Sequence, residues 1–223
     1  SKRAAFYAKR NGKDRIQVYE GGINEESQDK ETGYEQVAPT VYALVAAIDA
    51  KDSFTFQHST NVSQYAVLLA QKLGLSRNDI QTVKVAGLLH DIGKIGIPES
   101  ILKKAGKLTN EEYEIMKSHV EKSIEMIHYL PNMNYVIPAV VSHHERYDGK
   151  GYPRGIKGEE IPFLGRILAV CDSFDAMISK RAYKEALSVE YAMGELEKNK
   201  GTQFDPKAAD AFIELIKEGK VPL

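Results

Sequence analysis

The sequence is poor in cysteine and in net charge, and it lacks long apolar runs. Its single cysteine, Cys171, cannot form a disulfide within one chain and is typical of a reducing compartment. A formal net charge of −1 argues against broad electrostatic attraction to nucleic acid or to an anionic membrane. No apolar run approaches the roughly 18 residues of a spanning helix, and no secretory signal opens the chain. We therefore expect a cytoplasmic protein that binds neither DNA nor RNA and has no membrane segment in this chain.

The size and composition indicate a soluble globular protein. A chain of 223 residues, with 43% hydrophobic and 27% charged residues, can form one medium domain or one domain with an appendage. A unit of that size buries roughly 70% of its extended-chain surface without disulfide support. Because the sequence begins at Ser1 without methionine, we expect a piece of a longer protein, and the parent could carry a membrane anchor.

Signals for helix ends dominate the sequence, so we expect an all-α fold. Ser76 with Asp79 and Thr109 with Glu112 resemble capping boxes, and Asp205-Pro206 supplies an N-cap and a first-turn proline. Strand-like alternation is clearest only from Arg15 to Tyr19. A polar, acid-rich stretch follows Gly21-Gly22, which predicts an N-terminal helix–strand appendage over residues 1–35 and one helical domain over residues 36–223.

The histidines suggest the chemistry. Of the six histidines, five can be arranged as one site, and the sixth, His128, is interpreted as structural. Imidazole and carboxylate together suit iron, manganese, nickel or zinc. Two such ions roughly 3.5–4 Å apart can clamp a phosphoryl oxygen and activate water. The candidate residues are His58, His90, His119, His143 and His144, with Asp91 and Asp172 as the matching carboxylates.

The step from His90 to Asp91 constrains their local structure. Neighbouring residues in a helix diverge by about 100°, so both side chains reach one metal pair only near a helix end. Gly93 is interpreted as the marker of that end. The same argument covers His143 and His144, which precede a glycine-rich stretch long enough to suggest function. The alternative is that these are ordinary hydrogen-bonded histidines at the ends of apolar helices.

Two long motifs resemble a known family. The run HDIGK, from His90 to Lys94, resembles the HD signature of metal-dependent phosphohydrolases. The run HHERYDGKGYP, from His143 to Pro153, resembles the second signature of the HD-GYP proteins. The pattern continues through Asp172 and covers roughly residues 50 to 215.

The resemblance implies a helical bundle around a metal centre that hydrolyses a cyclic dinucleotide, with cyclic di-GMP favoured, to linear pGpG or GMP in bacterial second-messenger signalling. It implies two divalent ions, with iron or manganese favoured and zinc or nickel as alternatives. The bridging ligand would be Asp91. The full ligand set it implies is His58, His90, Asp91, His119, His143, His144 and Asp172.

The resemblance also assigns residues to the substrate. Lys94 would act with Asp91 in catalysis and meet the scissile phosphate, where its charge stabilises developing negative charge. Tyr152 would lie near the guanine or the phosphate. Arg181 and Lys184 would hold phosphate oxygens, the first through its planar fork and the second as a compact charge.

Three positions depart from the family pattern. Phe54 stands where three-metal members have a glutamate, so we expect two metals. Ala182 replaces the usual proline after Arg181, which could loosen the substrate grip. The stretch from Val120 to Ser123 lacks the expected glycine.

The N-terminal stretch from Ala5 to Tyr19 resembles the closing helix and strand of a GGDEF domain, which would place a regulatory domain upstream in the parent protein. Two alternatives to the phosphodiesterase remain: a receptor or interaction module that binds a cyclic dinucleotide without cleaving it, and an HD phosphohydrolase of another nucleotide. The sequence leaves open the metal, the choice between cyclic di-GMP and cyclic GMP-AMP, the final product and a homodimer.

Overall fold

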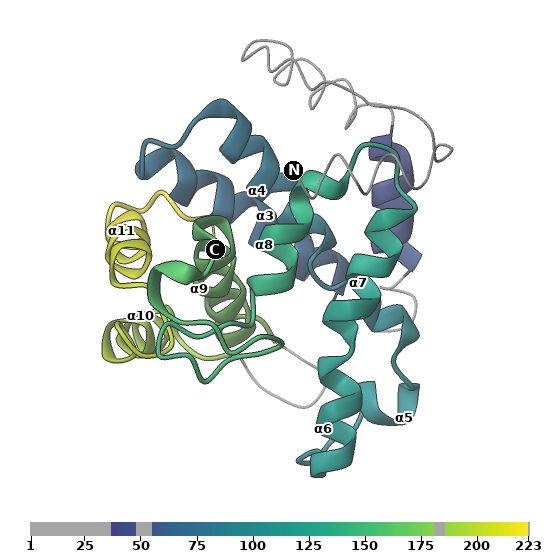
Figure 1. The fold of residues 1–223 in the computed structure, drawn as a ribbon. Coiled ribbons are helices and arrows are strands. Elements are labelled where there is room, and N and C mark those ends of the chain that lie inside the picture. The colour runs from purple at the N-terminus through teal and green to yellow at the C-terminus, as the bar shows by residue number, and fades with distance from the viewer. Residues whose placement is uncertain (1–36, 48–54, 181–185, 223) are drawn as a thin grey trace.

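The computed structural model describes residues 37–47, 55–180 and 186–222, and within these ranges it is helical with no strand (Figure 1). The expected all-α fold is therefore confirmed. The expected strand from Arg15 to Tyr19, the stretch that resembles the end of a GGDEF domain and the polar linker all lie outside the described residues. None of the described helices is both long and apolar enough to cross a membrane.

Most of the described helices follow one another through short connections, and residues 143–157 form a longer one. Residues 37–47 form the first described helix. The later elements are α3 (Thr55–Lys72), α4 (Arg77–Leu89), η1 (Ile92–Gly96), α5 (Glu99–Leu102), α6 (Asn110–Lys117), α7 (His119–His128), η2 (Asn134–Val136), α8 (Ile137–Ser142), η3 (Gly158–Glu160), α9 (Phe163–Ile178), α10 (Val189–Lys198) and α11 (Pro206–Lys217).

The caps expected from the sequence begin three of these helices. The Ser76 side chain accepts from the backbone N–H of Asp79 at the start of α4. Thr109 and Glu112 form a complete capping box at the start of α6. Asp205 accepts from the backbone of Ala208 at the start of α11. Each side-chain cap satisfies a backbone donor that the first helical turn leaves free.

The helix that begins after Thr109 is short, and a second helix follows it directly. Helix α6 ends at Lys117, and α7 begins at His119. The Ser118 hydroxyl donates to the Ile115 carbonyl at 2.6 Å, and a serine that bonds to a nearby carbonyl competes with helix continuation. The break places His119 at the first position of a new helix.

The core lies between α3 and α9, with α4, α8, α10 and α11 packed around this pair (Figure 1). Tyr65 of α3, Phe174 of α9 and Phe212 of α11 form an aromatic cluster, with ring centroids 5.1 to 6.0 Å apart. Phe174 and Phe212 are fully buried, and burial of each stabilises the fold by roughly 1.5–3 kcal/mol. The cluster fixes α9 against α3, and these two helices carry Asp172 and His58.

Candidate metal centre

The Asp91 carboxylate lies at the centre of the histidine cluster. Its Oδ2 atom is 3.2 Å from His90 Nε2 and 3.8 Å from His58 Nε2. Its other oxygen, Oδ1, is 3.3 Å from His119 Nε2. Asp91 is only 2% exposed. One buried carboxylate therefore presents its two oxygens toward imidazoles from different helices.

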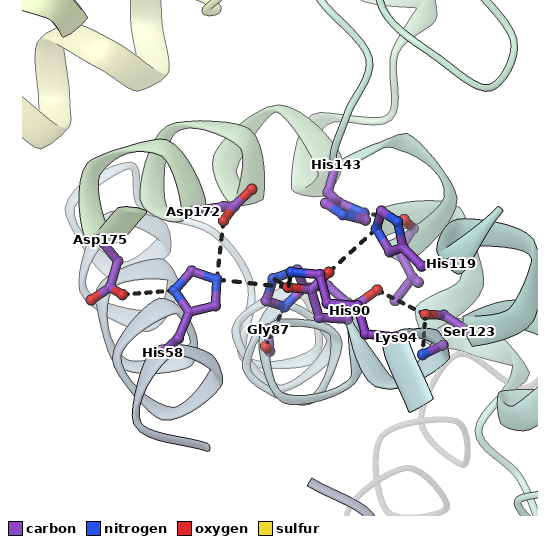
Figure 2. A network of polar contacts seen from close by, with 12 residues as sticks. His58, Gly87, His90, Lys94, His119, Ser123, His143, Asp172 and Asp175 are labelled. Atoms are coloured by element: carbon purple, nitrogen blue, oxygen red, sulfur yellow. Dashed lines mark hydrogen bonds and ion pairs between the residues drawn. The ribbon is translucent and has the colours of Figure 1, made fainter. Parts of the chain in front are cut away.

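Two groups of ligand atoms share Asp91. In the first, the ligand atoms of His58, His90 and Asp91 lie within 4.8 Å of one another; in the second, those of Asp91, His119, His143 and His144 do so. Asp172 adjoins the first group, with Oδ1 3.1 Å from His58 Nε2. Figure 2 shows His58 facing Asp172 on one side of His90, with His119 and His143 on the other. All seven ligands expected from the sequence thus converge, in an arrangement that would suit two ions bridged by one carboxylate.

Helix ends bring the ligands together. His90 is the C-cap of α4 and His143 the C-cap of α8. Asp91 has backbone angles φ −107° and ψ 4°, outside the α-helical region, which allows consecutive side chains to face one site. The expectation that the pair lies near a helix end is confirmed.

Gly93 follows the end of α4, as expected, but it does not have the left-handed backbone conformation of a glycine helix cap. Gly93 is absent from the glycines with positive φ. A Cβ atom at this position would lie 2.0 Å from the His119 carbonyl oxygen and 2.5 Å from Ser123 N. Close approach of the backbone of α7 is therefore the reason that this position requires glycine.

Backbone carbonyls orient three of the histidine rings. The Nδ1 atoms of His90, His119 and His143 lie 2.5 to 2.8 Å from the carbonyl oxygens three residues earlier in the chain. Since a carbonyl only accepts hydrogen bonds, each Nδ1 carries the proton and each Nε2 keeps a lone pair. This is the tautomer in which a histidine binds a metal through Nε2.

The free lone pairs provide a test of whether a metal suits this site. The Nε2 atoms of His90, His119 and His143 are buried, and each lacks a hydrogen-bond partner among the described residues, as does Asp91 Oδ1. Buried polar atoms without partners are costly, and each one calls for an explanation. Divalent cations would accept lone pairs from these atoms, so the residues fit a metal centre.

The protonation states also favour metal binding. Burial lowers the pKa of His119, lowers that of His143 well below its usual value, and lowers that of His144 to about 4. Burial by itself raises the pKa of a carboxyl, but Lys94 and His90 hold the pKa of Asp91 well below its usual value. Three neutral imidazoles and an ionised carboxylate result, and these are the forms that bind metal ions.

His58 has an unexpected second partner. Burial alone lowers its pKa, but hydrogen bonds with Asp172 and Asp175 outweigh this effect and raise the pKa to about 9. The Asp175 Oδ2 atom lies 2.6 Å from His58 Nδ1, and Asp175 is fully buried. Asn61 donates to Asp175 Oδ1 at 2.8 Å. A cation at His58 Nε2 would replace the proton on that nitrogen. The hydrogen bond between His58 Nδ1 and Asp175 would remain.

Lys94 and Tyr152 both border the ligand groups. Lys94 Nζ lies 2.6 Å from Asp91 Oδ2, and its side chain is 20% exposed. The Tyr152 ring lies 4.7 Å from the His144 ring, centroid to centroid, at an interplanar angle of 31°. An ammonium group and an aromatic ring thus adjoin the proposed ligands.

The chain after His144 folds back on itself to place Tyr152. The Tyr152 N–H donates to the His144 carbonyl at 3.2 Å. A Cβ atom on Gly151 would lie 2.3 Å from Arg146 N, so the backbone could not approach so closely with any other residue. The buried Glu145 accepts from Arg154 N at 2.7 Å and anchors the returning segment of this loop.

Some candidates cannot be placed, and one lies apart. Arg181 and Lys184 lie outside the described residues, as do Phe54 and Ala182. His128 ends α7, is exposed, and contacts the side chain of Asn134 at 2.8 Å. Its interpretation as structural agrees with this contact.

Sequence reasoning missed two buried residues that support the ligands. Asp175 orients His58. Ser123 donates to the His90 carbonyl at 3.0 Å and accepts from Gly93 N at 2.8 Å, which ties α7 to the HDIGK turn. Asp175 follows Asp172 by three residues, a spacing that places both carboxylates on one face of a helix. That spacing is a signal that could have identified Asp175, whereas Ser123 was noted only as a departure from the family pattern.

Comparison with known proteins identifies the family. The protein family described as HD domain matches residues 43–208. A cyclic di-GMP phosphodiesterase response regulator of Xanthomonas campestris is 41% identical over 181 residues, which cover 80% of this chain and 48% of the relative. A 3′3′-cGAMP-specific phosphodiesterase 2 of Vibrio cholerae is 39% identical over 176 residues, or 78% of this chain and 34% of the relative. The chain thus spans less than half the length of these relatives.

A solved structure shares the fold. The crystal structure of a cyclic GMP-AMP-specific phosphodiesterase of V. cholerae superposes with a TM-score of 0.64 at 18% identity, covering 81% of this chain and 49% of that one. At this identity the likeness shows the fold alone. The chain belongs to the HD domain family and carries the paired motifs of its HD-GYP type.

Proposed function

We propose that this chain is a metal-dependent phosphodiesterase that opens the ring of a cyclic dinucleotide, with cyclic di-GMP as the favoured substrate and pGpG, GMP or both as products. The observation that carries the proposal is the pair of ligand groups that share Asp91. The names of the relatives support the substrate class, because they are phosphodiesterases of cyclic di-GMP and of 3′3′-cGAMP.

The proposed cofactors are two divalent ions, iron or manganese before zinc or nickel. One would be held by His58, His90, Asp91 and Asp172, the other by Asp91, His119, His143 and His144. Such a pair supplies Lewis acidity to the phosphoryl oxygens and lowers the pKa of water to near neutrality.

The residues around the ions then have distinct tasks. In the reaction the oxygen of one water bonds to phosphorus, the bond from phosphorus to one ribose oxygen breaks, and that ribose oxygen takes up a proton. Negative charge increases on the phosphoryl oxygens as this occurs. The Lys94 ammonium group, 2.6 Å from Asp91 Oδ2, would lie beside the phosphoryl oxygens and stabilise this negative charge. The buried Asp175 keeps the His58 ring oriented throughout.

Other assignments remain predictions. Tyr152 is proposed to contact the substrate, and Arg181 and Lys184 to hold its phosphates. We also propose that residues 36–223 form the catalytic domain and that residues 1–35 are the end of a GGDEF domain in a longer signalling protein.

The deciding experiment is anaerobic turnover of cyclic di-GMP by the purified chain after chelation, with iron, manganese or no metal returned and the products separated by chromatography. Metal-restored formation of pGpG or GMP is expected. Binding of metal and of cyclic di-GMP without ring opening would contradict the proposal and favour the receptor. Turnover of 3′3′-cGAMP alone would correct the substrate.

A further inference from the structure

Helix α6 projects at one edge of the molecule (Figure 1) and contributes little to the core. It has no buried residue. Tyr113 on this helix is 47% exposed, and Lys117 lies four residues later, on the same helical face. A large aromatic side chain that is half in solvent, on a helix that buries nothing, contributes little to fold stability. Its exposed ring surface is therefore accessible to a ligand.

These two side chains extend the metal site toward solvent. The Tyr113 ring lies 6.3 Å from the Tyr152 ring, centroid to centroid, at an angle of 80°. Tyr152 in turn lies 4.7 Å from His144. The rings thus form a continuous series from a proposed metal ligand to an exposed tyrosine.

Lys117 places a positive charge beside both tyrosine rings. Its Nζ atom lies 5.3 Å from the Tyr113 ring centroid and 5.7 Å from that of Tyr152, within the range of a cation–π contact. The same ammonium is 2.7 Å from Glu114 Oε1, whose side chain is 69% exposed. That ion pair is at the surface, where such pairs contribute little, so Lys117 can exchange it for another acceptor at small cost.

Two rings and an ammonium group have the chemistry of a nucleobase site. Stacking of a base on an aromatic side chain typically strengthens binding about 5-fold or more. The edge of guanine that carries N7 and O6 offers two acceptors, and lysine is a usual donor to them. Adenine presents an amino donor at the same edge, which an ammonium group cannot satisfy.

We propose that Tyr113, Tyr152 and Lys117 form a base subsite beside the metal centre, which receives one guanine of the substrate while its phosphate lies at the metals. The inference rests on the proposed function and adds to it two residues of α6, Tyr113 and Lys117. Because the two rings stand at 80° to each other, a base that stacks face to face on one tyrosine meets the edge of the other, and Lys117 favours guanine over adenine.

The stacking role is tested with Tyr113→Ala, Tyr113→Phe and Ile115→Ala in the metal-loaded full chain. Tyr113→Ala is expected to raise KM for cyclic di-GMP at least about 5-fold, with a smaller effect on kcat and with metal content unchanged by elemental analysis. Tyr113→Phe keeps the aromatic ring, so its KM should stay close to the wild-type value. Ile115 is on the same helix and is 41% exposed, so Ile115→Ala controls for effects on α6 itself.

The base preference is tested with Lys117→Met, which keeps the length of the side chain without its charge. Cyclic di-AMP is added as a competitor of cyclic di-GMP turnover, and its inhibition constant is divided by KM. This ratio is expected to fall at least about 5-fold in the variant. An unchanged ratio would remove Lys117 from the proposal.

The outcomes distinguish failure of the base subsite from failure of the proposed function. Unchanged KM in Tyr113→Ala, in a wild type that cleaves cyclic di-GMP, overturns the subsite and leaves the proposed function intact. Equal KM increases in Tyr113→Ala and Ile115→Ala indicate a merely structural role and also overturn it. A wild type that cleaves no cyclic dinucleotide overturns the proposed function, and the subsite with it.

Discussion

The Asp175 carboxylate lies 2.6 Å from His58 Nδ1 in the interior of the protein, while the opposite ring nitrogen, Nε2, is 3.1 Å from Asp172 (Figure 2). Asp172 and Asp175 both project from α9. One helix therefore supplies the proposed ligand Asp172 and the carboxylate of Asp175, which orients the proposed ligand His58. A carboxylate bonded to the far nitrogen of a metal-binding histidine fixes the ring and increases its basicity.

Asp175→Asn is therefore expected to weaken metal binding without removing a ligand. The amide keeps the shape of the side chain and loses its charge, so metal affinity should fall about 10- to 100-fold. Titration of the chelated protein with manganese measures this. Asp210→Asn changes an exposed aspartate on α11 and should leave affinity unchanged; equal effects from both variants would contradict the orienting role.

Removal of a proposed metal ligand should weaken metal binding more than Asp175→Asn does. We expect His90→Ala and Asp91→Ala to abolish metal loading and turnover, since each removes an atom of a ligand group. His128→Ala should keep both, because His128 is exposed, contacts the side chain of Asn134 and belongs to neither ligand group. Elemental analysis of the three variants checks the assignment, which fails if all three lose metal equally.

Metal should also stabilise the fold. Ligand at 100 times its dissociation constant stabilises the native state by about 2.7 kcal/mol, which corresponds to a rise in Tm of about 5 to 10 °C for a domain of this size. The increase should appear in a thermal melt when manganese is returned to the chelated wild type. In Asp91→Ala no increase is expected, because the shared ligand is missing; a full increase there would mean that the ion binds elsewhere.

Gly93→Ala tests the contact between α7 and the HDIGK turn. The new Cβ atom would lie 2.0 Å from the His119 carbonyl, so α7 must move and carry His119 away from Asp91. We expect a lower Tm together with weaker metal binding. Gly194→Ala is the matched control, because a Cβ atom in that helix meets nothing within 4 Å, and alanine there should stabilise by up to about 1 kcal/mol. Unchanged metal affinity in Gly93→Ala would show that this contact does not position His119.

Much of the helical plan could be predicted from local patterns. Ser76, Thr109 and Asp205 begin the helices expected of them, because a cap is a contact between residues three apart and depends on local sequence alone. The break at Ser118 had no clear signal in the sequence, since a serine within an apolar pattern is compatible with a continuous or an interrupted helix. Gly93 was interpreted only as the marker of a helix end, because its neighbours in space are 26 or more residues away in sequence.

The sequence by itself determined the ligand chemistry of this protein: which residue types could bind a metal, where three of the helices begin, and which family the two motifs resemble. Only the tertiary structure decided how those residues combine. It placed Asp91 in both ligand groups, supplied Asp175 behind His58 and brought Tyr113 to Tyr152. The physical reason is that helix formation and capping depend on contacts a few residues apart, whereas these relationships depend on how α3, α6 and α9 pack against distant segments.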